Sequence, residues 1–184
     1  MCWRQEYVSA AAGWRLVARH GASATLLHAA LAPGGARLAL AAADASLAVW
    51  ERRGAAWREC GRAELRARGW AAVARVHWAP AGGRLLLAGP LALVDDWELL
   101  VLCVEEDGRC GAVASRVRCS AGAAGCWADV AGEAFLSLEL RRLGLGLYCT
   151  TVWLNSATQE TQSEYAGVTM PLLRIYNEDG QHIT

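Results

Sequence analysis

Short apolar segments alternate with turn residues along most of the chain. In the first third, apolar segments at residues 25–31, 38–42 and 46–50 are separated by the turn Ala32–Gly35 and by Asp44. Alanine is the best helix former, but these breaks leave no room for a helix of ordinary length. The pattern therefore predicts antiparallel β-strands.

The same pattern returns later in the chain as an internal repeat. The segment Ala32–Leu38 reappears as Ala79–Leu85, with the two prolines 47 positions apart. WD-type propeller repeats run to about 40 to 45 residues, so this period is typical of propeller blades. An insertion around Leu93–Trp97 accounts for the longer second copy, whose third strand we expect at Glu98–Val104. A third unit runs from Gly125 to Tyr176.

These features predict an all-β fold, a partial WD-repeat β-propeller of about three four-stranded blades. We expect a linker at residues 1–13 and blades at about 14–60, 61–120 and 121–184. Propellers usually need four to eight blades to close a ring. The chain is therefore expected to be a fragment, with uncovered edges and apolar faces.

Four residues of the first predicted blade match the polar set of WD-type blades. His20 lies upstream, Asp44 and Ser46 flank the start of the third strand, and Trp50 closes that strand. A buried carboxylate needs hydrogen-bond donors, and a buried tryptophan needs a partner for its N–H. We interpret these residues as structural.

The same residues include the types found in a Ser-His-Asp triad, but the pattern does not support catalysis. No nucleophile elbow surrounds Ser46. The four histidines are scattered and no cysteine pair has zinc-ligand spacing. The sequence therefore predicts a non-catalytic protein without cofactor or metal, and a hydrolase or metal enzyme is the disfavoured alternative.

Charge and hydropathy argue against two classes of binding partner. Eighteen acidic residues balance eighteen basic ones, so we expect neither nucleic-acid nor membrane binding. The longest uncharged apolar stretch, Leu85–Val94, is too short for a membrane helix, and the N-terminus does not resemble a secretory signal. Seven cysteines in no recurrent framework indicate free thiols and a cytoplasmic location.

One segment carries a closer resemblance. Cys149–Glu160 resembles a strand and following loop of the F-box/WD-repeat protein 5 family, and residues 125–127, 115–118 and 3–7 also fit. The resemblance implies a substrate-recognition subunit of a cullin-type E3 ubiquitin ligase. Its propeller would bind protein substrates, while an F-box would recruit a Skp-type adaptor and the cullin scaffold. The F-box would precede Trp3 and is absent from this chain.

A short motif at the end of the third predicted strand suggests a second way of joining a ubiquitin ligase. Trp50–Arg53 resembles the Trp-Asp-x-Arg motif that docks on a damaged-DNA-binding adaptor, with Glu51 in place of the aspartate. Glu51 and Arg53 are therefore candidate docking residues. A charged turn after a strand is the alternative interpretation. For the whole chain, the alternative function is a WD-repeat interaction scaffold unrelated to ubiquitin.

Overall fold

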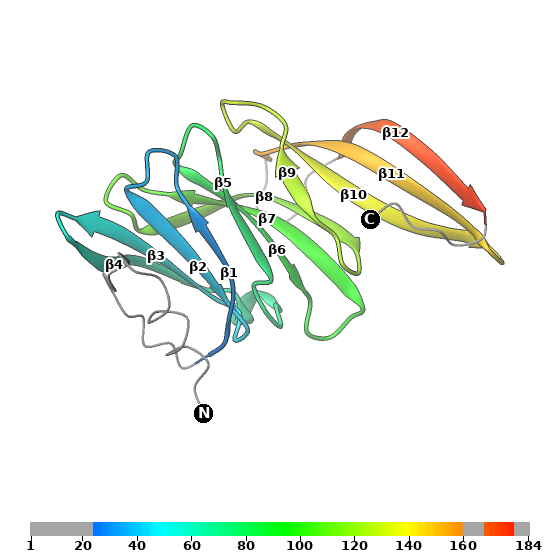
Figure 1. The fold of residues 1–184 in the computed structure, drawn as a ribbon. Helices are drawn as coiled ribbons and strands as arrows, with labels where there is room; N and C mark the ends of the chain where they lie inside the picture. Colours follow the sequence, from blue (N-terminus) through cyan, green and yellow to red (C-terminus); the bar gives the residue numbers. More distant parts are fainter. Residues whose placement is uncertain (1–23, 160–167, 179–184) are drawn as a thin grey trace, which may run out of the picture.

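The fold is built from β-strands arranged in three sheets. The structure, a computed structural model, describes residues 24–159 and 168–178. The strands form three four-stranded antiparallel sheets in the orders β1-β2-β3-β4, β5-β6-β7-β8 and β12-β11-β10-β9 (Figure 1). This confirms the prediction of an all-β, propeller-like fold. The strands are β1 (Leu26–Leu31), β2 (Arg37–Ala42), β3 (Ser46–Arg53), β4 (Ala56–Glu64), β5 (Arg75–Trp78), β6 (Arg84–Pro90), β7 (Asp96–Val104), β8 (Cys110–Ser120), β9 (Gly125–Trp127), β10 (Ala134–Gly144), β11 (Leu147–Ser156) and β12 (Val168–Glu178).

The first sheet follows the apolar pattern of the sequence closely. β1, β2 and β3 coincide with the three expected segments to within a few residues. The sheet continues to Glu64 at the end of β4, four residues past the boundary expected at residue 60. Gly34 and Gly35 have φ values of 80° and 71°, a left-handed conformation that glycine adopts without strain, and this conformation explains their place in the β1–β2 turn.

The second sheet repeats the first with a longer central hairpin. Leu38 pairs with Trp50 in the first sheet, whereas Leu85, its counterpart, pairs with Leu102 in the second. Trp97 lies inside β7, opposite Pro90, and is therefore not the structural counterpart of Trp50. The extra residues form the connection between β6 and β7, close to the predicted insertion.

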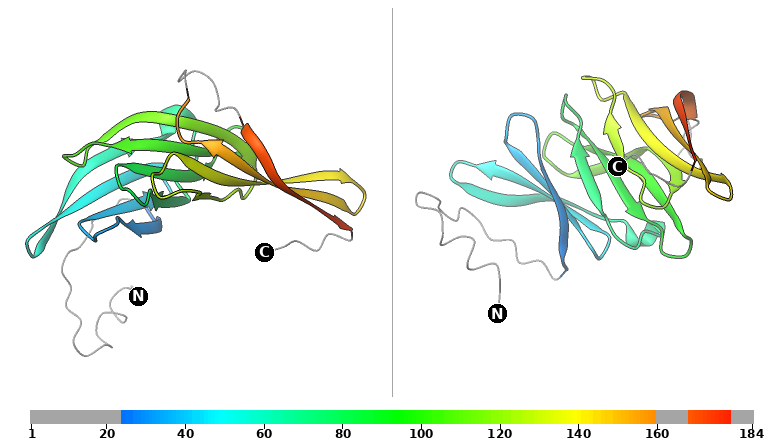
Figure 2. Two further views of the ribbon diagram at one scale, coloured as in Figure 1. Left: turned by 90° about the horizontal axis from the view of Figure 1, so that it is seen from above. Right: turned by 45° about the vertical axis from the view of Figure 1, so that its right-hand side comes forward.

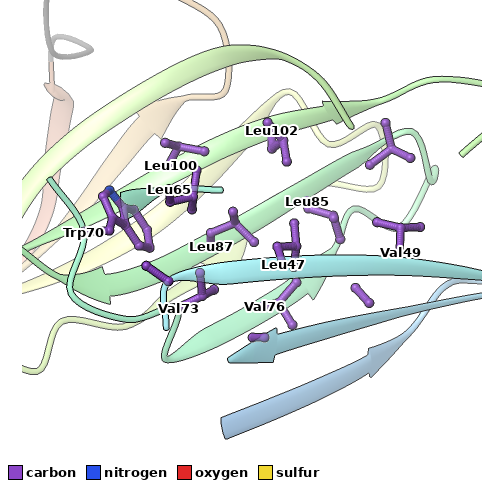
Figure 3. Packing of buried hydrophobic residues seen from close by; sticks show 14 of the residues in the cluster. Leu47, Val49, Leu65, Trp70, Val73, Val76, Leu85, Leu87, Leu100 and Leu102 are labelled. Carbon is purple, nitrogen blue, oxygen red and sulfur yellow. The ribbon is translucent and has the colours of Figure 1, made fainter. Parts of the chain in front are cut away.

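The three sheets pack face to face in sequence order. The first core lies between sheets one and two, where Leu47 and Val49 of β3 pack with Leu85 and Leu87 of β6, all completely buried (Figure 3). A second, smaller core joins sheets two and three around Phe135. Across the described residues the sheets fan out as an open arc (Figure 2).

A tryptophan in the first strand of each following sheet ties it to the sheet before. The indole Nε1–H of Trp78 donates to the carbonyl of Ala30 at 3.0 Å. Trp127 donates in the same way to the carbonyl of His77 at 3.3 Å. The repeated contact aligns β1, β5 and β9, because each indole combines large apolar area with one polar link.

Candidate membrane spans were sought among the described residues. None of the helices there has the length and apolar character needed to cross a bilayer.

Candidate functional site

The predicted structural residues Asp44 and Ser46 are in direct contact. The Asp44 carboxylate accepts from the Ser46 hydroxyl at 2.6 Å and from the Ser46 backbone N–H at 3.1 Å. The hydroxyl contact is the largest cause of a lowered pKa for Asp44. These bonds fix the tight turn that reverses the chain between β2 and β3.

The other two members of that set lie elsewhere. Trp50 is half-buried on β3, at the register position opposite Leu38 and four residues beyond Ser46. His20 lies outside the described residues. The polar set therefore remains a prediction as a whole, although its Asp44–Ser46 contact is present.

The candidate docking residues line a pocket between the first two sheets. Its volume is about 480 Å³, and it opens where the end of β3 and the middle of β4 approach the turn between β7 and β8. The side chain of Arg53 is 68% exposed, so its guanidinium is free to reach a ligand. The lining residues are Glu51, Arg53, Arg58, Glu59, Cys60, Asp107 and Arg109.

Arg37 holds the two walls of the pocket together. Its guanidinium lies 3.6 Å from the Glu51 carboxylate on the first sheet. It also donates to the backbone carbonyls of Glu105 and Glu106, in the turn of the second sheet. The Arg37 side chain therefore bridges the first two sheets, with a carboxylate on one side and backbone carbonyls on the other.

Two glycines allow the walls to approach closely. A Cβ added to Gly61 would lie 2.3 Å from the carbonyl oxygen of Gly108. A Cβ at Gly108 would lie 2.4 Å from the Cys60 sulfur. The backbones of β4 and the β7–β8 turn are therefore in contact at distances that only glycine permits.

The charges in the pocket are paired locally. Arg53 Nε donates to Glu51 at 2.9 Å, and this bond is the largest cause of the lowered pKa of Glu51. Asp107 accepts from the backbone N–H of Arg109, which lowers the pKa of Asp107, and its other oxygen meets Arg109 Nε at 2.6 Å. Three carboxylates and three guanidiniums leave the lining with no net charge.

The thiol at the base of the pocket is not activated. Burial, followed by the nearby charge of Glu51, raises the pKa of Cys60. Its Sγ contacts the carbonyl of Val49 at 3.3 Å. A thiol with a raised pKa carries little thiolate at neutral pH. The pocket's chemistry is therefore that of paired charges presented to a polar ligand.

The sequence indicated only part of this site. Glu51 and Arg53 were identified from the motif, whereas nothing in the sequence linked residues 105–108 to them. These residues form the turn between β7 and β8, and Asp107 lines the pocket. The internal repeat was the available signal, because packed repeats bring hairpins of successive units together.

A buried ion pair in the second sheet was not expected from the sequence. Glu98 on β7 is completely buried and accepts from Arg116 on β8 at 2.9 and 2.8 Å. Its second oxygen accepts from the indole of Trp70. The backbone N–H of Arg116 also donates to the Gln159 side chain at 2.9 Å. These contacts join the start of the second unit to the segment that follows β11.

Two histidines meet on neighbouring first strands. The rings of His28 and His77 are 5.4 Å apart between centroids, and the Val76 N–H donates to His28 Nδ1 at 3.4 Å. Burial, then the nearby His28 and Arg75, lower the pKa of His77. Among the described residues, no group of three or more His, Cys, Asp or Glu side chains could hold a metal ion.

Comparison with known proteins identifies a fold and no family. No protein-family model matches the chain. No curated protein matches it either.

Solved structures share the architecture at low identity. A protein from Bacteroides fragilis provisionally assigned as a 6-phosphogluconolactonase matches with a TM-score of 0.57 and 10% identity, covering 84% of this chain and 40% of that one. A protein from Bacteroides uniformis with the same provisional assignment matches with a TM-score of 0.54 and 12% identity, covering 85% and 45%. Saccharomyces cerevisiae Sqt1 matches with a TM-score of 0.47 and 13% identity, covering 86% and 38%. This chain therefore spans less than half the length of these structures.

These similarities correct the prediction that the protein is non-catalytic. That prediction came from the lack of a paired nucleophile and base in the sequence. Two of the similar structures are provisionally assigned as an enzyme, 6-phosphogluconolactonase. A catalytic role was thus excluded too early, because a fold can carry several functions and an active site need not follow a familiar motif.

Proposed function

We propose that the three sheets are WD-type blades and that the chain is the protein-binding part of a substrate receptor for a cullin-type ubiquitin ligase. In this proposal the pocket beside Glu51 and Arg53 docks a damaged-DNA-binding adaptor, and other surfaces bind the protein substrate. A Skp-type adaptor and the cullin scaffold would join through an F-box. The proposed location is the cytoplasm.

The observation that carries the proposal is the position of Arg53. The residue that matches the last position of the docking motif has an exposed guanidinium at the mouth of a pocket of about 480 Å³. Glu51, at the motif's acidic position, orients that guanidinium through a 2.9 Å bond. Arginine is enriched among the few residues that carry most of the binding energy at protein interfaces.

The most specific part of the resemblance also has a defined place in the fold. Residues 149–156 form most of β11, and Gln159 returns to the second sheet, where its backbone N–H donates to the carbonyl of Ala114 at 3.0 Å. The segment therefore connects two blades. In the proposed receptor this segment would set the angle between the blades and the shape of the binding surface.

A matched pair of arginine variants tests the docking step. Arg53 and Arg141 have the same exposure, 68%, and each pairs with a glutamate two residues earlier, Glu51 and Glu139. In a quantitative pull-down with the purified adaptor, Arg53→Ala is expected to weaken binding about tenfold or more, as for a hot-spot arginine. Arg141→Ala, far from the pocket, should bind like the unmodified chain.

Equal binding by both variants would contradict docking at this pocket. Loss of binding by both would show that the assay reports a general effect of removing an exposed arginine. If the unmodified chain fails to bind the adaptor at all, the ligase proposal loses its support from the motif.

A second candidate, from a different class, is favoured by the structural similarity. The two provisional lactonases share this architecture, so hydrolysis of a sugar-phosphate lactone is a function to test on this chain. Arg58 and Arg109 in the pocket are groups suited to hold a phosphate. The measurement is the rate of 6-phosphogluconolactone ring opening, followed against the spontaneous rate. A rate that Arg58→Ala and Arg109→Ala leave unchanged would exclude this pocket as the site.

A further inference from the structure

The pocket between the first two sheets contains one arginine without an acidic partner. Arg58 on β4 lies opposite Glu51 of β3 in the strand pairing. The Glu51 carboxylate is already occupied, because Arg53 Nε donates to it at 2.9 Å and Arg37 lies 3.6 Å away. Among the residues that the structure describes, the Arg58 guanidinium has no ion pair or hydrogen bond. Its positive charge is therefore left unbalanced.

The other two carboxylates that line the pocket are occupied as well. Glu59 accepts from Nε and Nη2 of Arg62, at 2.8 and 3.0 Å. Asp107 lies 2.6 Å from Arg109 Nε. The lining residues alone carry no net charge, but Arg62 and Arg37 contact its acids from outside the lining. Each acid thus has a guanidinium partner already, and none is left for Arg58.

Arg53 and Arg109 supply further donors from the two sides of the pocket. Arg53 belongs to the first sheet and Arg109 to the β7–β8 turn of the second. Each contacts its carboxylate through Nε, so the terminal Nη nitrogens of both stay unpaired within the described part of the chain. The side chains are 68% and 75% exposed. Such nitrogens form strong hydrogen bonds to carboxylate and phosphate oxygens.

The balance of charge favours a carboxylate over a phosphate as the ligand. A carboxylate carries one negative charge, which matches the single unbalanced guanidinium of Arg58. A phosphate group carries about −1.5 to −2 at pH 7. Its excess charge would lie beside Glu51, Glu59 and Asp107, which line the same pocket. An aspartate or glutamate side chain of a protein partner supplies the single charge and two acceptor oxygens.

We propose that the pocket binds one aspartate or glutamate side chain of a protein partner, held by Arg58 together with the Nη nitrogens of Arg53 and Arg109. This inference rests on the proposed docking function, and it adds the chemical group that the partner presents. Little rearrangement is needed on binding, because Arg37 already bridges the two sheets and Gly61 lets β4 lie against the β7–β8 turn.

The first test compares two short glycine-serine peptides with blocked ends, one with a central glutamate and one with glutamine in its place. Binding to the 184-residue chain is followed by NMR of the arginine Nε–H signals. We expect a dissociation constant on the order of 1 mM for the glutamate peptide, and binding of the glutamine peptide at least about tenfold weaker. Inorganic phosphate is the third probe and should bind more weakly than the glutamate peptide.

A matched pair of arginine variants locates the site. Arg58→Gln is expected to weaken binding of the glutamate peptide about tenfold or more. The control is Arg52→Gln, because Arg52 is exposed on the neighbouring strand β3 but does not line the pocket. It removes the same charge from the same region, and it should bind the peptide as the unmodified chain does.

Equal binding of the two peptides, stronger binding of phosphate, or equal effects of the two variants would overturn the proposal. The adaptor pull-down separates it from the docking function. If the adaptor needs Arg53 but binds the Arg58→Gln variant normally, docking stands and the carboxylate site is wrong. If the adaptor does not bind while the glutamate peptide still requires Arg58, the carboxylate site stands and another protein is its partner.

Discussion

The buried ion pair between Glu98 and Arg116 allows a sharp test of what stabilises the second sheet. We expect Arg116→Met to destabilise the fold strongly at neutral pH. Methionine keeps most of the aliphatic packing but removes both charged bonds, at 2.9 and 2.8 Å, from a carboxylate that is completely buried. Among the described residues, the indole of Trp70 then remains as the side-chain donor to Glu98.

The size of the effect follows from burial. Removing one partner of a buried pair costs about 3 to 5 kcal/mol, because the other charge is left uncompensated. The Arg116 side chain is 19% exposed, and water can therefore reach part of the site. We expect a loss near the lower end, about 3 kcal/mol, which is a large part of a typical folding free energy of about 5 to 15 kcal/mol.

The assay is reversible urea unfolding at pH 7, followed by circular dichroism. Arg118→Met on the same strand is the control, because its pair with Asp96 spans 3.1 Å between side chains that are 47% and 42% exposed. An exposed pair is worth at most about 1 kcal/mol. Adding Glu98→Leu to Arg116→Met should restore part of the stability, since no buried charge then remains. A loss below about 1 kcal/mol for Arg116→Met, or a double variant less stable than the single one, would show that Glu98 does not need Arg116 as a partner.

Three further predictions concern other contacts. Gly61→Ala should lower the free energy of unfolding by about 2 kcal/mol, because the added Cβ would overlap a backbone carbonyl. Gly144→Ala is the control and should be neutral, because no atom lies within 4 Å of its added Cβ. Urea unfolding of the two variants measures the difference. Burial, then the nearby His28, lowers the pKa of His77 in the folded protein. The unfolded chain therefore binds a proton more readily than the folded one, and the free energy of unfolding should fall as the pH drops below about 6.5. His77→Gln should reduce that fall, and an unchanged pH profile would contradict the assignment. Cys126 is exposed and should be alkylated before Cys119, because burial raises the pKa of the Cys119 thiol to about 12. Peptide mass spectrometry measures the order, and faster alkylation of Cys119 would contradict the prediction.

Strand positions were largely predictable because they depend on local chemistry. The turn Ala32–Gly35 and its repeat at Ala79–Gly83 combine proline with glycines that adopt positive φ, and such turns end strands wherever they occur. Alternating apolar residues then identify the buried face of each strand. The three predicted units therefore correspond to the three observed sheets.

Register and contacts between sheets were harder to infer. Trp97 lies 47 positions after Trp50, yet the longer β6–β7 connection makes Leu102 the true counterpart. A repeat in the sequence does not show where an insertion ends. Hydrogen-bond pairing between strands decides the register, because a shift of one residue would turn each side chain to the other face.

Local patterns in the sequence were enough to predict the elements, the turns, the repeat and the motif that contains Glu51 and Arg53. They did not reveal that Arg37 bridges the first two sheets or that Glu98 is buried with Trp70 and Arg116. The two kinds of feature differ in range. Strand and turn preferences act over a few neighbouring residues, whereas burial and charge pairing depend on groups far apart in the chain, and only folding brings those groups together.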